Sequence, residues 1–142
     1  MKLLKGLVLL LSISLFGCEK EEDITEIQNP ELVAVAFFDA LYNQKDIKKA
    51  ASVCGPKLAR ILLHYNSTTA VARHLFNMQY DSVEIKPDDS GVKVREQFKE
   101  KADITIYFDG KYLEDRVKDV KRLRLIQQDG RWIIDKILKD PF

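Results

Sequence analysis

The sequence has few of the residues on which most catalytic and metal sites depend. Its 142 residues include two cysteines, two histidines and one tryptophan. It contains no zinc-type Cys/His spacing, no nucleophile-elbow motif and no phosphate-cradling glycine loop. An enzymatic function therefore has no supporting motif, and we expect neither a cofactor nor a metal.

Long apolar runs are also missing, apart from one near the start of the chain. Residues 7–16 are mostly apolar, and Lys2 and Lys5 precede them. About ten residues rise roughly 15 Å as a helix, half of a bilayer's hydrocarbon core, so this run is too short to span a membrane. A basic segment followed by a short apolar one is typical of a secretory signal.

The apolar run ends on residues 15–18, Leu-Phe-Gly-Cys, and the chain then becomes charged at once. These four residues resemble the bacterial lipobox. The resemblance implies that the Cys18 thiol takes a diacylglyceryl group, that cleavage follows Gly17 and that the new amino group is acylated. Since each buried methylene contributes about 0.8 kcal/mol, two or three acyl chains make a stable anchor. The alternative is an ordinary signal peptide with an incidental cysteine.

The residues after Cys18 bear on the membrane address. Glu19 and Lys20 do not resemble the Asp-led signal that retains some lipoproteins at the inner membrane. We therefore expect a lipid-anchored protein of the bacterial cell envelope that faces the periplasm from the outer membrane.

Removing residues 1–17 leaves 125 of the 142 residues, enough for one domain with a core. Residues 18–28 are predicted to be the lipidated cysteine and a flexible polar tether, and residues 29–142 a single domain. With Cys18 lipidated, Cys54 has no internal disulfide partner. We interpret Cys54 as a buried structural thiol, with an intermolecular or reactive role as the alternative.

Charge of one sign does not dominate the mature chain. Without Lys2 and Lys5 it has 21 basic and 22 acidic side chains, a net charge of −1. This balance gives no reason to expect nucleic acid as a partner. The sequence leaves the oligomeric state open.

The first half of the domain has helical periodicity, and the second half alternates. Asn29 followed by Pro30 is typical of a helix N-terminus, and Asp46 is expected to cap a second, short helix. Helices are predicted over residues 30–44, 46–53, 58–65 and, capped by Thr68 or Thr69, 68–78. Strands are predicted over residues 82–86, 92–98, 102–108, 120–128 and 131–138, with the charged segment 111–119 as a candidate edge strand.

Two Asp-Gly pairs are the strongest turn signals in the second half. Asp109-Gly110 and Asp129-Gly130 each separate strand-like runs, and tight hairpins favour such pairs because both central residues take positive φ. We therefore expect hairpins at both pairs. Helices followed by antiparallel strands predict an α+β fold.

Residues 30–50 (PELVAVAFFDALYNQKDIKKA) and 125–137 (LIQQDGRWIIDKI) resemble the nuclear transport factor 2-like superfamily. They are most similar to its small bacterial lipoproteins of unknown function. The resemblance covers most of residues 29–139 and implies N-terminal helices packed on a curved antiparallel sheet, which together form a cone with a pocket. Members use this pocket for catalysis, ligands or protein partners, so the resemblance alone does not give the function.

Catalytic members of that fold use acids and histidines inside the pocket. Asp135 is predicted to share a strand face with Ile133 and Ile137, and His74 to lie on the apolar side of its helix, whereas His64 should be solvated. A His74/Asp135 pair could serve proton transfer in an isomerase- or dehydratase-like enzyme. We favour the interpretation that His74 is a satisfied, partly buried histidine and that Asp135 pairs with a nearby base.

The preferred function is a non-catalytic binding module, tethered to the membrane, for a small apolar ligand or an envelope protein. The residues expected to line the pocket are Phe37, Leu41, His74 and Trp132. Trp132 should share a buried face with Ile134.

One basic group needs a separate interpretation. It consists of Lys118, Lys121, Arg122 and Arg124, and it could contact phosphates or lipid headgroups. Acids interleave it, and its two arginines alternate with leucines, so a solvated strand face is the preferred interpretation.

Overall fold

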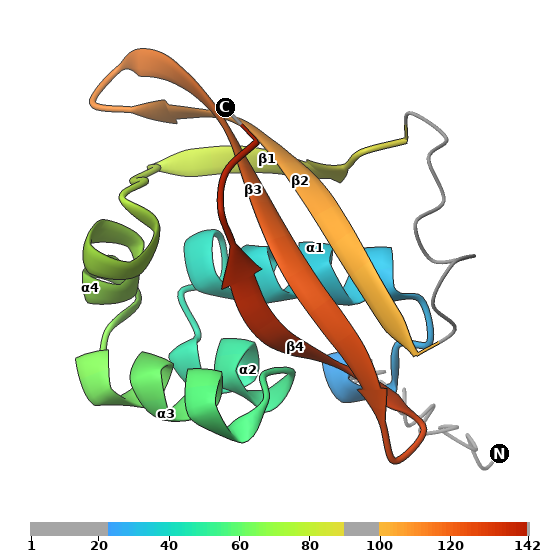
Figure 1. Ribbon diagram of the computed structural model, residues 1–142. Coiled ribbons are helices and arrows are strands. Elements are labelled where there is room, and N and C mark those ends of the chain that lie inside the picture. Colours follow the sequence, from blue (N-terminus) through green and yellow to red (C-terminus); the bar gives the residue numbers. More distant parts are fainter. Residues whose placement is uncertain (1–22, 90–99, 142) are drawn as a thin grey trace, which may run out of the picture.

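The computed structural model describes residues 23–89 and 100–141. Helices occupy the first half, and the second half forms an antiparallel sheet with strand order β1-β2-β3-β4. The helices pack on one face of this sheet, which is open rather than closed into a barrel (Figure 1). The predicted α+β class is confirmed.

The helical half begins with a short 3-10 turn and ends with a π-helical one. In the described residues its elements are η1 (Ile24–Glu26), α1 (Pro30–Tyr42), α2 (Ile47–Ser52), α3 (Pro56–Tyr65), α4 (Thr68–Val71) and η2 (Ala72–Phe76).

Side-chain caps set the starts of these helices. The Asn29 side chain accepts hydrogen bonds from the first backbone N–H groups of α1, and Asp46 caps α2. Both caps confirm the prediction. The cap of α4 is Ser67, one residue before the predicted threonines. Its side chain accepts from the Ala70 N–H at 3.1 Å.

The predicted tether is shorter than residues 18–28. Asp23 caps η1, Ile24 is buried in the core, and η1 contacts α1, α2 and β4. An apolar side chain at this position secures the segment to the domain. The domain therefore includes residues 23–28, and the stretch between Cys18 and Asp23 is four residues long.

The strands differ from the prediction chiefly at one turn. Their bounds are β1 (Ser82–Pro87), β2 (Lys101–Tyr112), β3 (Asp115–Gln128) and β4 (Arg131–Leu138). The predicted strand over residues 92–98 lies outside the described residues. The segment 111–119 is not an edge strand: it holds the end of β2, a turn and the start of β3.

The prediction of a hairpin at Asp109-Gly110 is wrong. β2 continues through both residues, and the turn follows at Leu113 and Glu114, where φ is 48° and 72°. Asp129-Gly130 does form the predicted turn, with φ of 52° and 75°. The two pairs look alike in sequence but serve different purposes.

Position 110 has no room for a side chain. A Cβ built on it would lie 2.4 Å from the Ser82 carbonyl oxygen, 2.6 Å from Tyr80 Cδ1 and 2.9 Å from Val83 Cβ. Val83 is the residue that pairs with Gly110 across β1 and β2. A glycine here lets the edge strand and the Tyr80 ring approach the backbone of β2.

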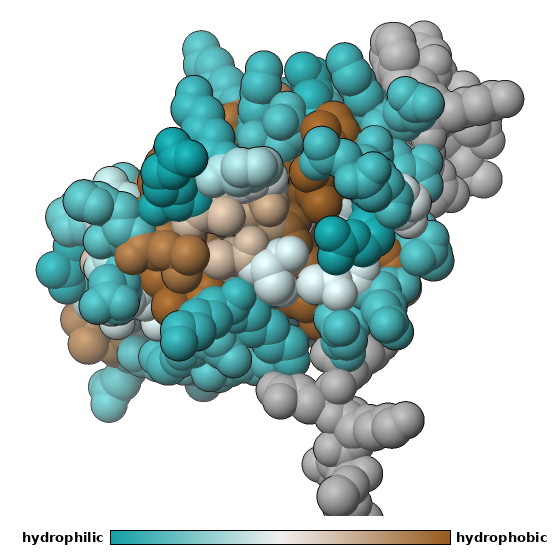
Figure 2. All heavy atoms as spheres, turned by 90° about the horizontal axis from the view of Figure 1, so that it is seen from below, coloured by the Kyte–Doolittle hydropathy of each residue, from teal (hydrophilic) through white to brown (hydrophobic). Residues whose placement is uncertain are grey.

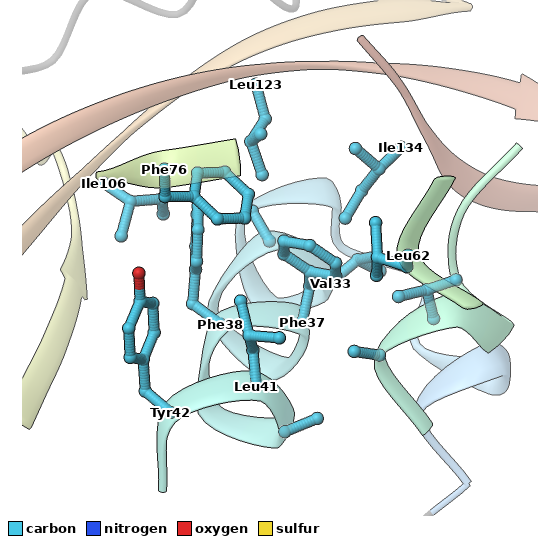
Figure 3. Packing of buried hydrophobic residues seen from close by; sticks show 14 of the residues in the cluster. Val33, Phe37, Phe38, Leu41, Tyr42, Leu62, Phe76, Ile106, Leu123 and Ile134 are labelled. Carbon is cyan, nitrogen blue, oxygen red and sulfur yellow. The ribbon is translucent and has the colours of Figure 1, made fainter. Parts of the chain in front are cut away.

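An aromatic cluster fills the space between α1 and the sheet. The Phe38 ring lies 4.8 Å from Phe108, 5.0 Å from Phe37 and 5.2 Å from Phe76, measured between centroids. Figure 3 shows Phe37 and Phe38 pointing from α1 into this cluster, with Leu123 above them on the sheet. Such edge-to-face contacts add to the stabilisation from burial.

A β-bulge changes the face assignment on β4. Leu125 pairs with Ile134, and Arg124 pairs with Lys136, so Asp135 is the extra residue between them. Beyond the bulge, Ile137 pairs with the buried Leu123 and packs against the core. The prediction that Asp135 shares a face with Ile137 is therefore wrong.

The outer face of the sheet carries charged pairs. Arg124 Nε and Nη2 donate to the two carboxylate oxygens of Asp103 at 2.7 and 2.9 Å. This bidentate contact lowers the pKa of Asp103 below its usual value of 3.8.

Replacing Asp103 by asparagine should cost about 0.5 to 1 kcal/mol at neutral pH. The folded-state pKa is lowered, so the advantage of the parent exists above the unfolded-state pKa, about 3.9. It should disappear as the pH falls through the lower, folded-state value. Urea melts of both proteins between pH 7 and pH 2 test this. An advantage of the parent that persists at pH 2 would contradict the assignment.

The face that carries α2 and α3 has its own surface pattern. Figure 2 views the molecule from below, where these helices lie, and shows apolar residues in the centre with hydrophilic ones around them.

Candidate binding site

A pocket of about 510 Å³ lies between η2 and the ends of β3 and β4. Leu75 and Phe76 of η2 form one part of its wall, and Ile137 and Leu138 of β4 form another. This volume is within the usual range for sites that hold small ligands.

Lys121 is the most buried charged residue in this pocket. It pairs with Ile106 across β2 and β3, so its side chain starts from the face of the sheet that bears the core. The residue is 8% exposed, and within the described residues it is the one charged residue classed with the buried core. A buried ammonium is costly unless it is paired.

The partner of Lys121 comes from the segment after β4. Lys121 Nζ donates to Asp140 Oδ2 at 2.6 Å. The Lys121 side chain is 10% exposed, and that of Asp140 is 41% exposed. The acid is thus the accessible half of this ion pair.

A second acid, Asp119, lines the same pocket and affects two tyrosines behind it. Burial raises the pKa of Tyr42 and of Tyr80, and the negative charge of Asp119 raises both further. The Tyr42 hydroxyl donates to the Met78 carbonyl oxygen at 3.1 Å. The Tyr80 hydroxyl is buried and has no hydrogen-bond partner among the described residues. Both phenols therefore stay uncharged at neutral pH.

Three of the four residues expected to line a pocket belong to the core instead. Phe37, Leu41 and Trp132 are all buried in the main hydrophobic cluster, and none of them lines the Lys121 pocket. Trp132 and Ile134 share the inner face of β4, as predicted. Because these residues are packed in the core, they do not line the candidate site, which lies at the edge of the core.

His74 and Asp135 are not brought together. His74 is exposed on η2, where its ring stacks on that of Tyr65 at a centroid distance of 5.8 Å. Asp135 is the bulge residue beside Arg124. Asp103 chiefly raises the pKa of that guanidinium, and the charge of Asp135 raises it further. The sheet thus separates the two candidates, since the helices cover its other face.

The expected burial of His74 is wrong for a reason that lies in the helix. The prediction assumed an α-helical period through residue 78, but the chain changes to π-helical geometry at Ala72. The wider turn alters the direction in which each later side chain points. His64 is exposed, as predicted.

The basic group divides between the two faces of the sheet. Lys118, Arg122 and Arg124 alternate with the inner residues, and Arg124 pairs with Asp103 on the outer face. Lys121 belongs to the inner face, so the prediction of one solvated strand face fails for it. Its two-residue spacing from Leu123 is the sequence signal that could have identified it.

Cys54 behaves as a structural thiol. Its Sγ donates to the Ala50 carbonyl oxygen at 3.4 Å, and burial raises its pKa to about 12. The backbone beside it joins β4, since the Gly55 N–H donates to the Ile134 carbonyl oxygen at 2.8 Å. A thiol so rarely ionised is a poor nucleophile at neutral pH.

Metal-binding clusters and membrane-spanning helices are both missing from the part of the chain that the structure describes. Residues 23–89 and 100–141 contain no group of three or more His, Cys, Asp or Glu side chains that could hold a metal ion. The helices in these ranges are all too short or too polar to cross a bilayer.

Comparison with known proteins adds no relative: no family model matches the chain, and no curated protein or solved structure matches it significantly.

Proposed function

We propose that this chain is an exported bacterial lipoprotein, anchored through Cys18, whose domain is a non-catalytic binding module. The signal-like residues 1–17 and the lipobox-like residues 15–18 support the anchor. The helices packed on an open antiparallel sheet are compatible with a nuclear transport factor 2-like cone, and we propose membership of that superfamily.

The buried Lys121 is the observation that carries the binding function. A charged side chain at the base of a partly apolar pocket offers both orientation and apolar contact to a small ligand. The separation of His74 from Asp135 favours binding over proton-transfer chemistry, which needs its groups within hydrogen-bond reach.

The position of the proposed tether is compatible with ligand binding in the pocket. The described chain starts at η1, at the end of the molecule near the β3–β4 turn (Figure 1). η2 and the pocket lie toward the other end. A lipid on Cys18, five residues before Asp23, would hold the first end near the membrane and leave the pocket accessible.

A protein partner is the second candidate. The apolar centre of the face that carries α2 and α3 is the observation that favours it (Figure 2). Apolar areas with a polar rim are common at protein interfaces.

Native mass spectrometry of the protein purified from envelopes tests the binding function. The parent should retain a small-molecule adduct that is lost in Lys121→Met. Lys118→Met, which removes a lysine from the outer face, is the matched control and should keep the adduct. A parent without any adduct, or an adduct that survives Lys121→Met, would contradict the proposed site.

Replacing Cys18 by serine should move the protein out of the membrane fraction. The hydroxyl cannot form the thioether, and the charged residues that follow give no other anchor. Fractionation after a high-salt wash measures the effect. If the variant still sediments with membranes, the lipid is not the anchor.

A further inference from the structure

The Lys121–Asp140 ion pair joins a strand of the sheet to the segment that follows the last strand. Lys121 lies in β3, where it pairs with Ile106 of β2, and the ladder between β3 and β4 begins at the next residue, Arg122. Asp140 follows Leu138, the last residue of β4, and lies outside the strands of the sheet. The backbone of Lys121 is therefore held in the sheet, whereas Asp140 belongs to a segment without ladder pairing.

The exposures of the two side chains point the same way. Lys121 is 10% exposed and Asp140 is 41% exposed, so water reaches the acid far more easily than the base. A buried ammonium needs an anionic partner at all times, but nothing requires this partner to belong to the chain. Another carboxylate could take the same place.

The other residues of the pocket indicate which class of ligand could carry that carboxylate. Leu75, Phe76 and Ile137 provide apolar contact beside Lys121. Asp119 and Lys139 add one charge of each sign to the lining, so with Asp140 displaced the two lysines and Asp119 leave a net charge of +1. This balance suits a ligand with one negative charge better than a phosphate or a dicarboxylate with two. A single carboxylate on an apolar body fits both features.

We propose that Asp140 acts as a latch, and that the ligand of the pocket is a small monocarboxylate with an apolar body that displaces it from Lys121. The proposal rests on the proposed binding function and names the ligand class for the same site. In the free protein Asp140 neutralises Lys121 and partly closes the pocket. In the complex the ligand carboxylate accepts from Lys121 Nζ, and the apolar body lies against η2 and β4.

The latch has a consequence that a fixed ion pair would not have. Because Asp140 competes with the ligand, removing its charge should strengthen binding of a carboxylate. Removing Lys121 should weaken it, since the donor is lost. The two halves of one ion pair therefore have opposite effects on affinity.

The test uses octanoate as the probe and octanol as its neutral analogue. The domain that starts at Glu19 keeps every described residue of the core, so it is expected to fold alone. Titration calorimetry is run on the parent, Asp140→Asn, Lys121→Met and the outer-face control Lys118→Met. Circular dichroism of each variant verifies the fold.

The Kd of octanoate should be about tenfold lower for Asp140→Asn than for the parent. For Lys121→Met it should be higher than for the parent by about tenfold or more. Lys118→Met should bind as the parent does, and octanol should bind all four proteins weakly. If Lys121→Met does not fold, the latch is still tested by two comparisons: Asp140→Asn with the parent, and octanoate with octanol.

Three results would overturn the latch: no octanoate binding by any variant, equal binding of octanoate and octanol, or no gain in Asp140→Asn. Each is distinct from failure of the proposed function. An envelope-derived adduct that depends on Lys121, together with no octanoate binding, would keep the binding function and reject a monocarboxylate ligand.

Discussion

Replacing Trp132 by alanine is expected to lower the free energy of unfolding by about 3 to 5 kcal/mol, the usual cost of truncating a buried aromatic side chain. Trp132 is 6% exposed and belongs to the main core cluster. It shares the inner face of β4 with Ile134, whose exposed fraction is 0%. The loss would be a large part of the roughly 5 to 15 kcal/mol that stabilises most domains.

Urea melts of the domain that starts at Glu19 measure this effect. Tyr107→Ala is the control, because Tyr107 lies on the outer face and is 47% exposed. It should change the free energy of unfolding by less than about 1 kcal/mol. A Trp132→Ala midpoint equal to that of the parent would mean that the indole does not contribute to the core, and it would reverse the assigned faces of β4.

Replacing Gly110 by alanine should cost about 2 to 3 kcal/mol, in the upper part of the range for overpacking. The added Cβ would lie 2.4 Å from the backbone oxygen of Ser82. Backbone atoms cannot rotate away as a side chain can, so β1 and β2 would have to separate locally. The Tyr80 ring, 2.6 Å from the same position, would also have to move.

Gly130→Asn is the matched control for that substitution. Gly130 has φ of 75° and nothing within 4 Å of its added Cβ, and asparagine tolerates positive φ better than most residues. This variant should lose well under about 1 kcal/mol. If Gly110→Ala were as stable as Gly130→Asn in the same melts, the close approach of β1 to β2 would be wrong.

Local signals predicted most of the elements correctly. The cap at Asn29, the cap at Asp46 and the Asp129-Gly130 turn depend on residues within a few positions, and the structure has all three. The buried face of β4 near Trp132 also follows from simple alternation.

The errors arise where distant contacts decide the outcome. Gly110 is a glycine because Ser82 and Tyr80 approach it, which no local pattern shows. The exposure of His74 follows from a change to π-helical geometry that apolar periodicity does not reveal.

The candidate site was missed for a related reason. Lys121 stands among other basic residues, and composition alone favours a solvated face for such a group. Its inward direction follows from pairing with Ile106, and its partner Asp140 is 19 residues away along the chain. Both facts depend on the register of the folded sheet.

The proposed lipid anchor can be tested most directly by mass spectrometry of the mature protein purified from envelopes. We expect an N-terminal peptide that starts at Cys18 and carries the added mass of a diacylglyceryl group, with or without a further acyl chain. A mature chain that starts elsewhere, or that carries an unmodified Cys18, would contradict it.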